Sequence, residues 1–224
     1  GESLPTLTPR ALTFTALLAG VSQASQEQLA SSIKDAHAET TRTSEQLKAT
    51  LGALNALTKQ EKGDLRPTYD SYCAEVAKTE AAATWTRTRA QWMAGDGRKY
   101  FQDWQTTING IANESLRKKA QKRLDAVQKS YNNVEASLKL AAEKFTPFLS
   151  DLGDIQKTLA TDVTAGGVKA VKGTVKSANW NHQFVDKAIK AALKEMDKME
   201  KSLSGEAKSI WSRPAPRTVE GISG

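Results

Sequence analysis

The sequence predicts an all-α protein: an elongated up-and-down antiparallel bundle, or coiled coil, of about four long helices. Apolar residues recur at alternating steps of three and four along most of the 224 residues, which is the spacing of one apolar seam on a helix. Three short segments with helix-breaking residues interrupt this pattern. Aromatic residues make up 6% of the chain and the mean hydropathy is −0.52, values that suit long helices better than a globular core.

Residues 1–24 have the pattern of a secretory signal peptide. Arg10 precedes the largely apolar run from Ala11 to Val21, and the small residues of Ser22-Gln23-Ala24 follow where a signal peptidase requires them. The alternative is an apolar N-terminal helix that packs on the bundle. The run is too short to span a bilayer. We therefore expect cleavage after Ala24 and a single helical rod domain over residues 25–204.

The first long helix is expected from Ser25 to about Glu61. Its seam comprises Ile33, Ala36, Thr40, Thr43, Leu47, Thr50, Leu54 and Leu57. Because threonine is a poor helix former and packs a core less fully than leucine, we expect looser packing along this helix. Gly63-Asp64 ends it, and Pro67 suits the first turn of the next helix.

The second helix is expected from about Arg66 to Gln105. Its seam comprises Tyr69, Tyr72, Val76, Thr79, Ala83, Thr86, Ala90, Met93, Tyr100 and Trp104. The segment Gly95-Asp96-Gly97 interrupts the helix, but the seam continues on both sides of it. We therefore expect a weak point or kink within one helix and not a domain boundary.

The central helix is expected from Asn113 to Val163 and has the longest unbroken seam. That seam comprises Ala120, Leu124, Val127, Tyr131, Val134, Leu138, Ala141, Phe145, Phe148, Leu152, Ile155 and Leu159. At 1.5 Å per residue this helix would be roughly 75 Å long, and at about ten residues longer than its neighbours it should overhang them. Pro147 removes one backbone hydrogen bond, so we expect a kink there in a continuous helix.

A final helix follows the turn Thr164-Ala165-Gly166-Gly167, with its seam running from Val168 to Leu203. Residues 205–224 contain two prolines and are expected to form an irregular tail. Turns of a few residues cannot carry the chain back along a rod, so successive helices must run in alternate directions.

The sequence contains no constellation of residues that indicates catalysis, and we expect neither an enzyme nor a cofactor. A phosphate-binding loop of the form Gly-x4-Gly-Lys-Ser/Thr is absent. Cys73 is the one cysteine, which excludes an internal disulfide framework. His37 and His182 are the two histidines, and they fall on or beside seams where a tolerated polar residue is a better interpretation than a metal ligand.

Two groups of residues are candidates for contact with an anion or a partner. The first is a basic cluster at the start of the central helix, made of Arg117, Lys118, Lys119, Lys122 and Arg123. It is either a solvated helix end or a docking patch for phosphate or carboxylate polymers. The second is the pair Trp85 and Trp92, which share a helix face off the seam. We expect another helix of the bundle to cover them; the alternative is an exposed partner site.

Several short motifs occur in a fixed order: Asp35-Ala36, Leu65 with Tyr69-Asp70, Trp104 with Asn113-x-Ser115-Leu116-Arg117, Tyr131, and Glu143-Lys144 with Pro147-x-Leu149. This set, within Ile33 to Leu203, resembles a bacterial family of exported coiled-coil proteins, often lipoproteins, that is catalogued as a domain of unknown function. The resemblance implies no catalytic residue. The chain is basic where family members are acidic, and Val21 stands where a lipid-bearing cysteine would follow Leu18-Ala19-Gly20. A role based on acidic charge and a lipid anchor are therefore not carried over.

We expect a non-enzymatic, exported spacer or scaffold of the bacterial cell envelope, located in the periplasm or at the envelope. The formal charge of +7 favours an anionic envelope polymer as partner, and a protein bound through a helical face or self-association are further options. The alternative is a cytoplasmic coiled coil associated with nucleic acid, which we favour less. It would bind through the basic cluster and the lysines that flank the seam of the final helix.

Overall fold

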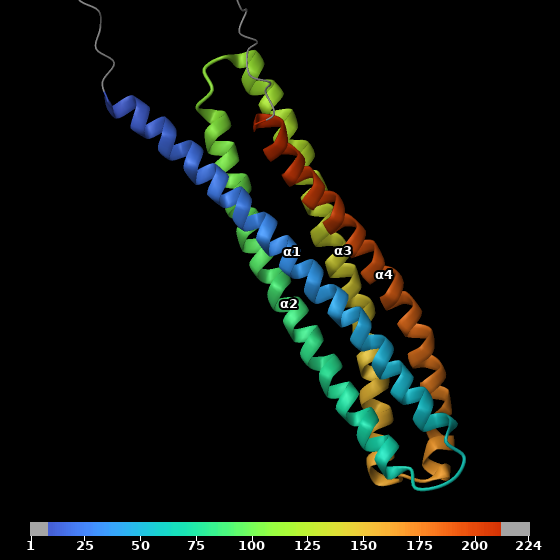
Figure 1. Cartoon of the computed structure of the whole chain (residues 1–224). Helices are drawn as coiled ribbons and strands as arrows, with labels where there is room; N and C mark the ends of the chain where they lie inside the picture. Colours follow the sequence, from blue (N-terminus) through green and yellow to red (C-terminus); the bar gives the residue numbers. More distant parts are fainter. Residues whose placement is uncertain (1–8, 212–224) are drawn as a thin grey trace, which may run out of the picture.

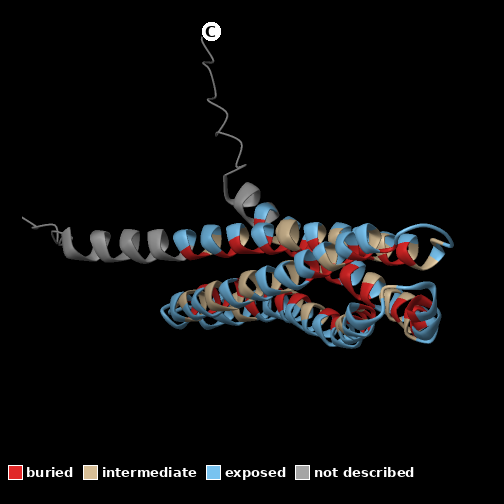
Figure 2. Ribbon diagram, turned by 90° about the horizontal axis from the view of Figure 1, so that it is seen from below, coloured by how far each residue is buried: buried red, intermediate tan, exposed pale blue. Residues whose placement is uncertain are grey.

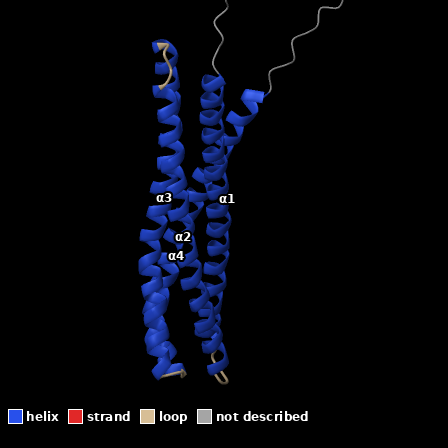
Figure 3. Cartoon of the chain, turned by 90° about the vertical axis from the view of Figure 1, so that its left-hand side faces the viewer, coloured by secondary structure: helices blue, strands red, loops and turns tan. Residues whose placement is uncertain are grey.

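The computed structural model describes the backbone of residues 9–211 and the side chains of residues 23–204. It contains four long helices, α1 (Pro9–Lys59), α2 (Arg66–Asn109), α3 (Glu114–Thr161) and α4 (Ala165–Trp211). They run alternately up and down and form a rod (Figures 1 and 3). The 48 residues of α3 span about 72 Å at 1.5 Å per residue. The prediction of an elongated all-α bundle is confirmed.

The short connections have local causes in the sequence. Gly63 has a φ of +86°, a backbone conformation that glycine adopts readily, in the turn between α1 and α2. Before α3, the Asn113 side-chain oxygen accepts a hydrogen bond from the Leu116 N–H at 2.9 Å and caps the helix. Before α4, the Thr164 hydroxyl accepts a hydrogen bond from the Gly167 N–H at 3.3 Å. The three turns therefore lie close to the expected positions, although α2 ends at Asn109 and not at about Gln105.

The helices associate as two hairpins. α1 packs mainly against α2, and α3 mainly against α4. Smaller contacts between α1 and α4 and between α2 and α3 join the hairpins. The α1–α2 and α3–α4 turns lie at one end of the rod, and the α2–α3 turn lies at the other end (Figure 1). Each hairpin is thus a firmly packed unit. The α2–α3 side is one of the two smaller contact surfaces that join the hairpins.

The hydrophobic core consists of two clusters along the rod. One includes Leu54, Tyr72, Phe148, Leu159 and Val185, towards the α1–α2 and α3–α4 turns. The other includes Ile33, Met93, Tyr131, Val134 and Met199, towards the α2–α3 turn. Buried residues form stripes on the sides of the helices that face one another, and the outer faces are exposed (Figure 2).

The seams expected from the sequence are almost wholly buried. All eight seam residues expected for the first helix are buried. In α3, every expected seam residue is buried except Ala120 and Leu138. In the middle of α2, however, the three consecutive seam residues Ala83, Thr86 and Ala90 are only half-buried. The core is therefore incomplete at mid-rod on this side.

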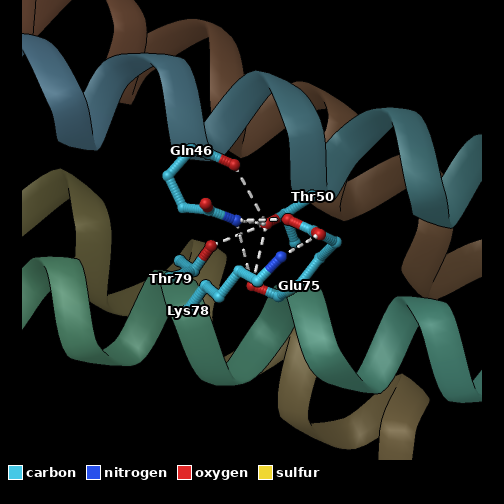
Figure 4. A network of polar contacts seen from close by, with 5 residues as sticks. All are labelled: Gln46, Thr50, Glu75, Lys78 and Thr79. Carbon is cyan, nitrogen blue, oxygen red and sulfur yellow. Dashed lines mark hydrogen bonds and ion pairs between the residues drawn. The ribbon is translucent and has the colours of Figure 1, made fainter.

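Threonines join α1 to α2 through hydrogen bonds. The hydroxyls of Thr50 and Thr79 are 2.7 Å apart and both side chains are fully buried. Around them Gln46 donates a hydrogen bond to the Glu75 carboxylate at 2.6 Å, and Lys78 pairs with the same carboxylate at 2.8 Å (Figure 4). These contacts, from Lys78 first and then Gln46, lower the pKa of Glu75. The threonine seam thus forms specific cross-helix bonds where looser packing was expected.

Three boundaries differ from the expectations. α3 has 48 residues, against 51, 44 and 47 for the other helices, so the prediction that it is longer by about ten residues is wrong. α4 continues past residue 205 to Trp211, and the remainder of the expected tail lies outside the described residues. The helical backbone of α1 begins at Pro9, whereas the side chains of residues 1–22, which hold most of the expected leader, are not described.

Both interruptions lie inside continuous helices. α2 runs through Gly95-Asp96-Gly97, and α3 runs through Pro147. Phe145 and Phe148, on either side of the proline, are buried, with ring centroids 6.2 Å apart. Continuation of the central helix through Pro147 is therefore confirmed.

Pro147→Ala should leave the protein folded and make α3 straighter. An alanine N–H can bond to the carbonyl of Glu143, and the buried residues on both sides are unchanged, so the free energy of unfolding should stay level or rise by up to about 3 kcal/mol. Thermal unfolding measures the first effect. Electron-spin distances between labels at Lys129→Cys and Lys157→Cys, in a Cys73→Ala background, measure the second. A clear loss of stability, or unchanged distances between the labels, would contradict this prediction.

Candidate functional site

The basic cluster lies on the first three turns of α3, at the end of the rod with the α2–α3 turn. Arg117, Lys118, Lys119, Lys122 and Arg123 are all exposed. Lys118 pairs with Glu114 at 2.7 Å, and an Arg117 N–H donates to the Ile111 carbonyl at 3.1 Å. Cations at a helix N-terminus oppose the helix dipole, and Glu114 partly offsets them. The surface remains strongly positive and open to a large anion.

The tryptophans of α2 are exposed, so the expectation that another helix covers them is wrong. Trp85 is 54% exposed and Trp92 is 53% exposed. Their position off the seam points them out of the bundle. The Arg89 guanidinium lies 4.9 Å from the centre of the Trp92 ring and 3.7 Å from the Asp35 carboxylate. This contact ties the tryptophan face of α2 to α1.

The structure does not bring the tryptophans and the basic cluster together. Trp92 lies 17 residues before the end of α2 at Asn109, which is about 26 Å along the rod. The basic cluster begins only a few residues into α3. They are separate surfaces and not two parts of one site.

A second exposed aromatic pair was missed in the sequence. On α4, Trp180 is 61% exposed and Phe184 is 42% exposed, and their rings meet edge to face with centroids 5.3 Å apart. Lys144 of α3 lies 6.0 Å from the Phe184 ring centre. The sequence pattern that indicates their exposure is their position between the seam residues Ala178 and Val185, off the buried face of the helix.

The two histidines have different partners in the structure. Among the described residues no group of three or more His, Cys, Asp or Glu side chains could hold a metal ion. His37 pairs with Asp197 at 3.0 Å. The His182 ring packs 5.7 Å from the centre of the buried Phe148 ring. Burial is the main cause that lowers the pKa of His182; nearby Lys48 and Lys190 act in the same direction, and Asp186 opposes them.

This burial predicts a pH dependence of stability. The unfolded chain takes up a proton on His182 near the ordinary pKa of about 6.5, while the folded chain does so only at lower pH. The stability that the bundle has with His182 neutral is therefore fully present above about pH 6.5 and is lost as pH falls towards the folded-state pKa. Titration of the His182 imidazole by NMR should give a pKa below 6.5, and His182→Gln should flatten the fall in melting temperature between pH 7 and 5. A pKa above 6.5 would contradict the burial.

Tyrosine hydroxyls fasten α2 to α3 at two levels. Towards the end of the rod that holds the α1–α2 turn, the Tyr72 hydroxyl donates to the Leu152 carbonyl at 2.7 Å and the Tyr69 hydroxyl donates to the Gln156 carbonyl at 2.9 Å. Nearer the other end, the Tyr131 hydroxyl proton is shared between the Met93 carbonyl of α2 at 3.1 Å and the Glu135 carboxylate of α3 at 2.9 Å. Burial, with a contribution from Cys73, raises the pKa of Tyr69 to about 12, and burial raises the pKa of Tyr72 and Tyr131 as well. The hydroxyls therefore stay protonated and keep donating.

Between these tyrosines a groove of about 340 Å³ opens along the α2–α3 side, and we call it the α2–α3 groove. Its α2 wall includes the half-buried Ala83, Thr86 and Ala90, and its α3 wall includes Leu138, Phe145 and Leu149. Thr40 and Thr43 of α1 and Ile189 of α4 also line it. The sequence signal was three small residues in succession on one seam, and it was not recognised.

No described helix is both long and apolar enough to be a candidate for crossing a membrane.

No curated protein and no solved structure matches the chain. One family model does match, over residues 18–203, and its description is "Protein of unknown function (DUF2959)". Because the match covers most of the chain, with α2, α3 and the greater part of α1 and α4, the protein belongs to the DUF2959 family of proteins of unknown function.

Proposed function

We propose that the protein is a non-enzymatic, exported spacer or scaffold of the bacterial cell envelope. The observation that carries this proposal is the form of the bundle. The helices α2, α3 and α4, of 44 to 48 residues, give a rod about 70 Å long, and the buried seam residues of all four helices pack between the helices along most of its length. Such a rod can hold two attachment points apart, at its ends or along its sides.

Export is supported by the composition of the leader. Cleavage after Ala24 would remove Arg10 and the apolar run that follows it, and would leave intact the described core, in which Ser25 and Leu29 are buried. The mature chain would therefore keep the two hairpins and their contacts. Removing Arg10 and Glu2 together leaves the formal charge at +7.

Fractionation of native cells tests this location. We expect the wild-type protein in the periplasmic or envelope fraction, and a Leu17→Arg, Leu18→Arg variant, whose apolar run is interrupted, in the cytoplasm. A Lys59→Gln, Lys62→Gln variant is the matched control, since it changes two exposed charges outside both the leader and the basic cluster and should fractionate like wild type. Recovery of wild type from the cytoplasm, with no difference between the variants, would refute export.

The exposed basic cluster supports a second candidate, a nucleic-acid-associated coiled coil in the cytoplasm. Neutralising phosphates with several cations makes binding fall steeply with salt. Retention on duplex DNA at about 50 mM salt, lost when all five basic residues are changed to glutamine, would favour this candidate. Failure to bind DNA together with retention on an anionic envelope polysaccharide would favour the scaffold.

A further inference from the structure

We propose that the α2–α3 groove binds the aliphatic chain of a single-chain anionic amphiphile, of which a long-chain fatty acid is the simplest example. Such binding goes beyond the scaffold role and does not depend on it. The site would lie at mid-rod, between the Tyr69–Tyr72 contacts and the Tyr131 contact.

The groove exists because small residues on α2 face larger ones on α3 without filling the space. Ala83, Thr86 and Ala90 occupy seam positions that in the rest of α2 hold mostly tyrosine, valine or methionine. Opposite them, Leu138 and Leu149 are only half-buried. Water against these side chains is unfavourable, and an aliphatic chain would remove it.

The dimensions favour one aliphatic chain over a helix. The volume of about 340 Å³ lies at the low end of small-molecule sites, which run from roughly 300 to 1,000 Å³. A helix about 10 Å across would need several times that room. The α2 wall runs from Ala83 to Ala94, about 16 Å along the axis, so the space is long and narrow.

The charges at the groove favour an anionic head group. Arg87 lines it from α2 and Lys139 from α3, and both are exposed. Neither makes a hydrogen bond or ion pair within the described part of the chain. Glu135 also lines the groove, with its carboxylate 2.9 Å from the Tyr131 hydroxyl, and the three charged side chains together leave one net positive charge. With one such cation on each wall, the groove favours an anionic head group over a cationic one.

Titration calorimetry with decanoate, dodecanoate and tetradecanoate, each below its micelle concentration, tests the proposal on the full chain. We expect one saturable site per chain. Each added methylene should tighten binding about fourfold, or about fifteenfold per step of the series, because each is removed from water. Dodecyltrimethylammonium, with the same chain and the opposite charge, should bind at least tenfold more weakly than dodecanoate.

Variants on both walls locate the site. Ala90→Leu on α2 and Ala142→Leu on α3 both place bulk in the groove, and each should weaken dodecanoate binding at least tenfold while the far-ultraviolet spectrum and melting temperature are retained. Ala81→Leu is the matched control, since Ala81 is exposed on α2 and does not line the groove. Arg87→Gln with Lys139→Gln should remove the preference for the anionic head group and leave the chain-length dependence.

Four results would overturn the proposal. The first is the absence of saturable binding, and the second is binding that does not tighten with chain length. The third is binding that persists in both folded groove variants, because the amphiphile would then lie elsewhere. A wild-type dimer that Ala90→Leu dissociates would also overturn it, since the occupant would be a second copy of the chain.

Discussion

Phe148→Ala should cost about 3–5 kcal/mol of the free energy of unfolding. Phe148 is fully buried, with its ring 6.2 Å from that of Phe145 and 5.7 Å from that of His182, measured between centroids. Removing the ring loses its burial from water and leaves a cavity between α3 and α4 that long, packed helices close only in part. Urea unfolding followed by circular dichroism measures the change.

Leu140→Ala provides the control on the same helix. Leu140 is 45% exposed, so its truncation should change stability by less than about 0.5 kcal/mol. A loss below about 1 kcal/mol for Phe148→Ala would contradict the buried position of the ring. Equal losses for the two variants would contradict the orientation of α3 as a whole.

Gly97→Ala is expected to have the second largest effect, a loss of about 1–3 kcal/mol from overpacking. A Cβ on Gly97 would lie 2.5 Å from Cζ and from the hydroxyl oxygen of Tyr131. The ring would have to move, and the hydrogen bond to the Met93 carbonyl would be broken or distorted. Thermal and urea unfolding should both report the loss.

Gly95→Ala, two residues away, should have the opposite sign. A Cβ there would meet only the end of the Arg98 side chain, at 3.9 Å, so replacing glycine inside a helix should raise stability by up to about 1 kcal/mol. In a Tyr131→Leu background, Gly97→Ala should cost less than in wild type, because the two positions are coupled by contact. If both glycine variants were stabilising, the close approach of Tyr131 to α2 would be wrong.

The sequence was sufficient for the fold because the bundle depends on a local, repeated pattern. Each helix buries one face, and the three-four spacing identifies that face from neighbouring residues alone. Seam residues such as Leu54, Phe148 and Met196 are buried as expected. The continuation of α3 through Pro147 follows from the same spacing, since the seam keeps its register across the proline.

The candidate sites were less accessible from the sequence because they depend on which helix lies opposite. Ala90 looks like an ordinary seam residue, and only its pairing with the residues of α3 leaves a groove. Trp85 and Trp92 are large apolar residues, which favoured burial, although their places off the seam put them outside. The hydroxyl pair of Thr50 and Thr79 depends on the register between α1 and α2, which periodicity does not give.

The N-terminus of the protein isolated from its native host tests the central proposal, an exported rod, most directly. Intact mass and N-terminal sequencing should give a chain that begins at Ser25, recovered from the periplasmic or envelope fraction. Such a chain retains the described core from Ser25 and Leu29 onward. A chain that still begins before Ala11, recovered from the cytoplasm, would contradict the account.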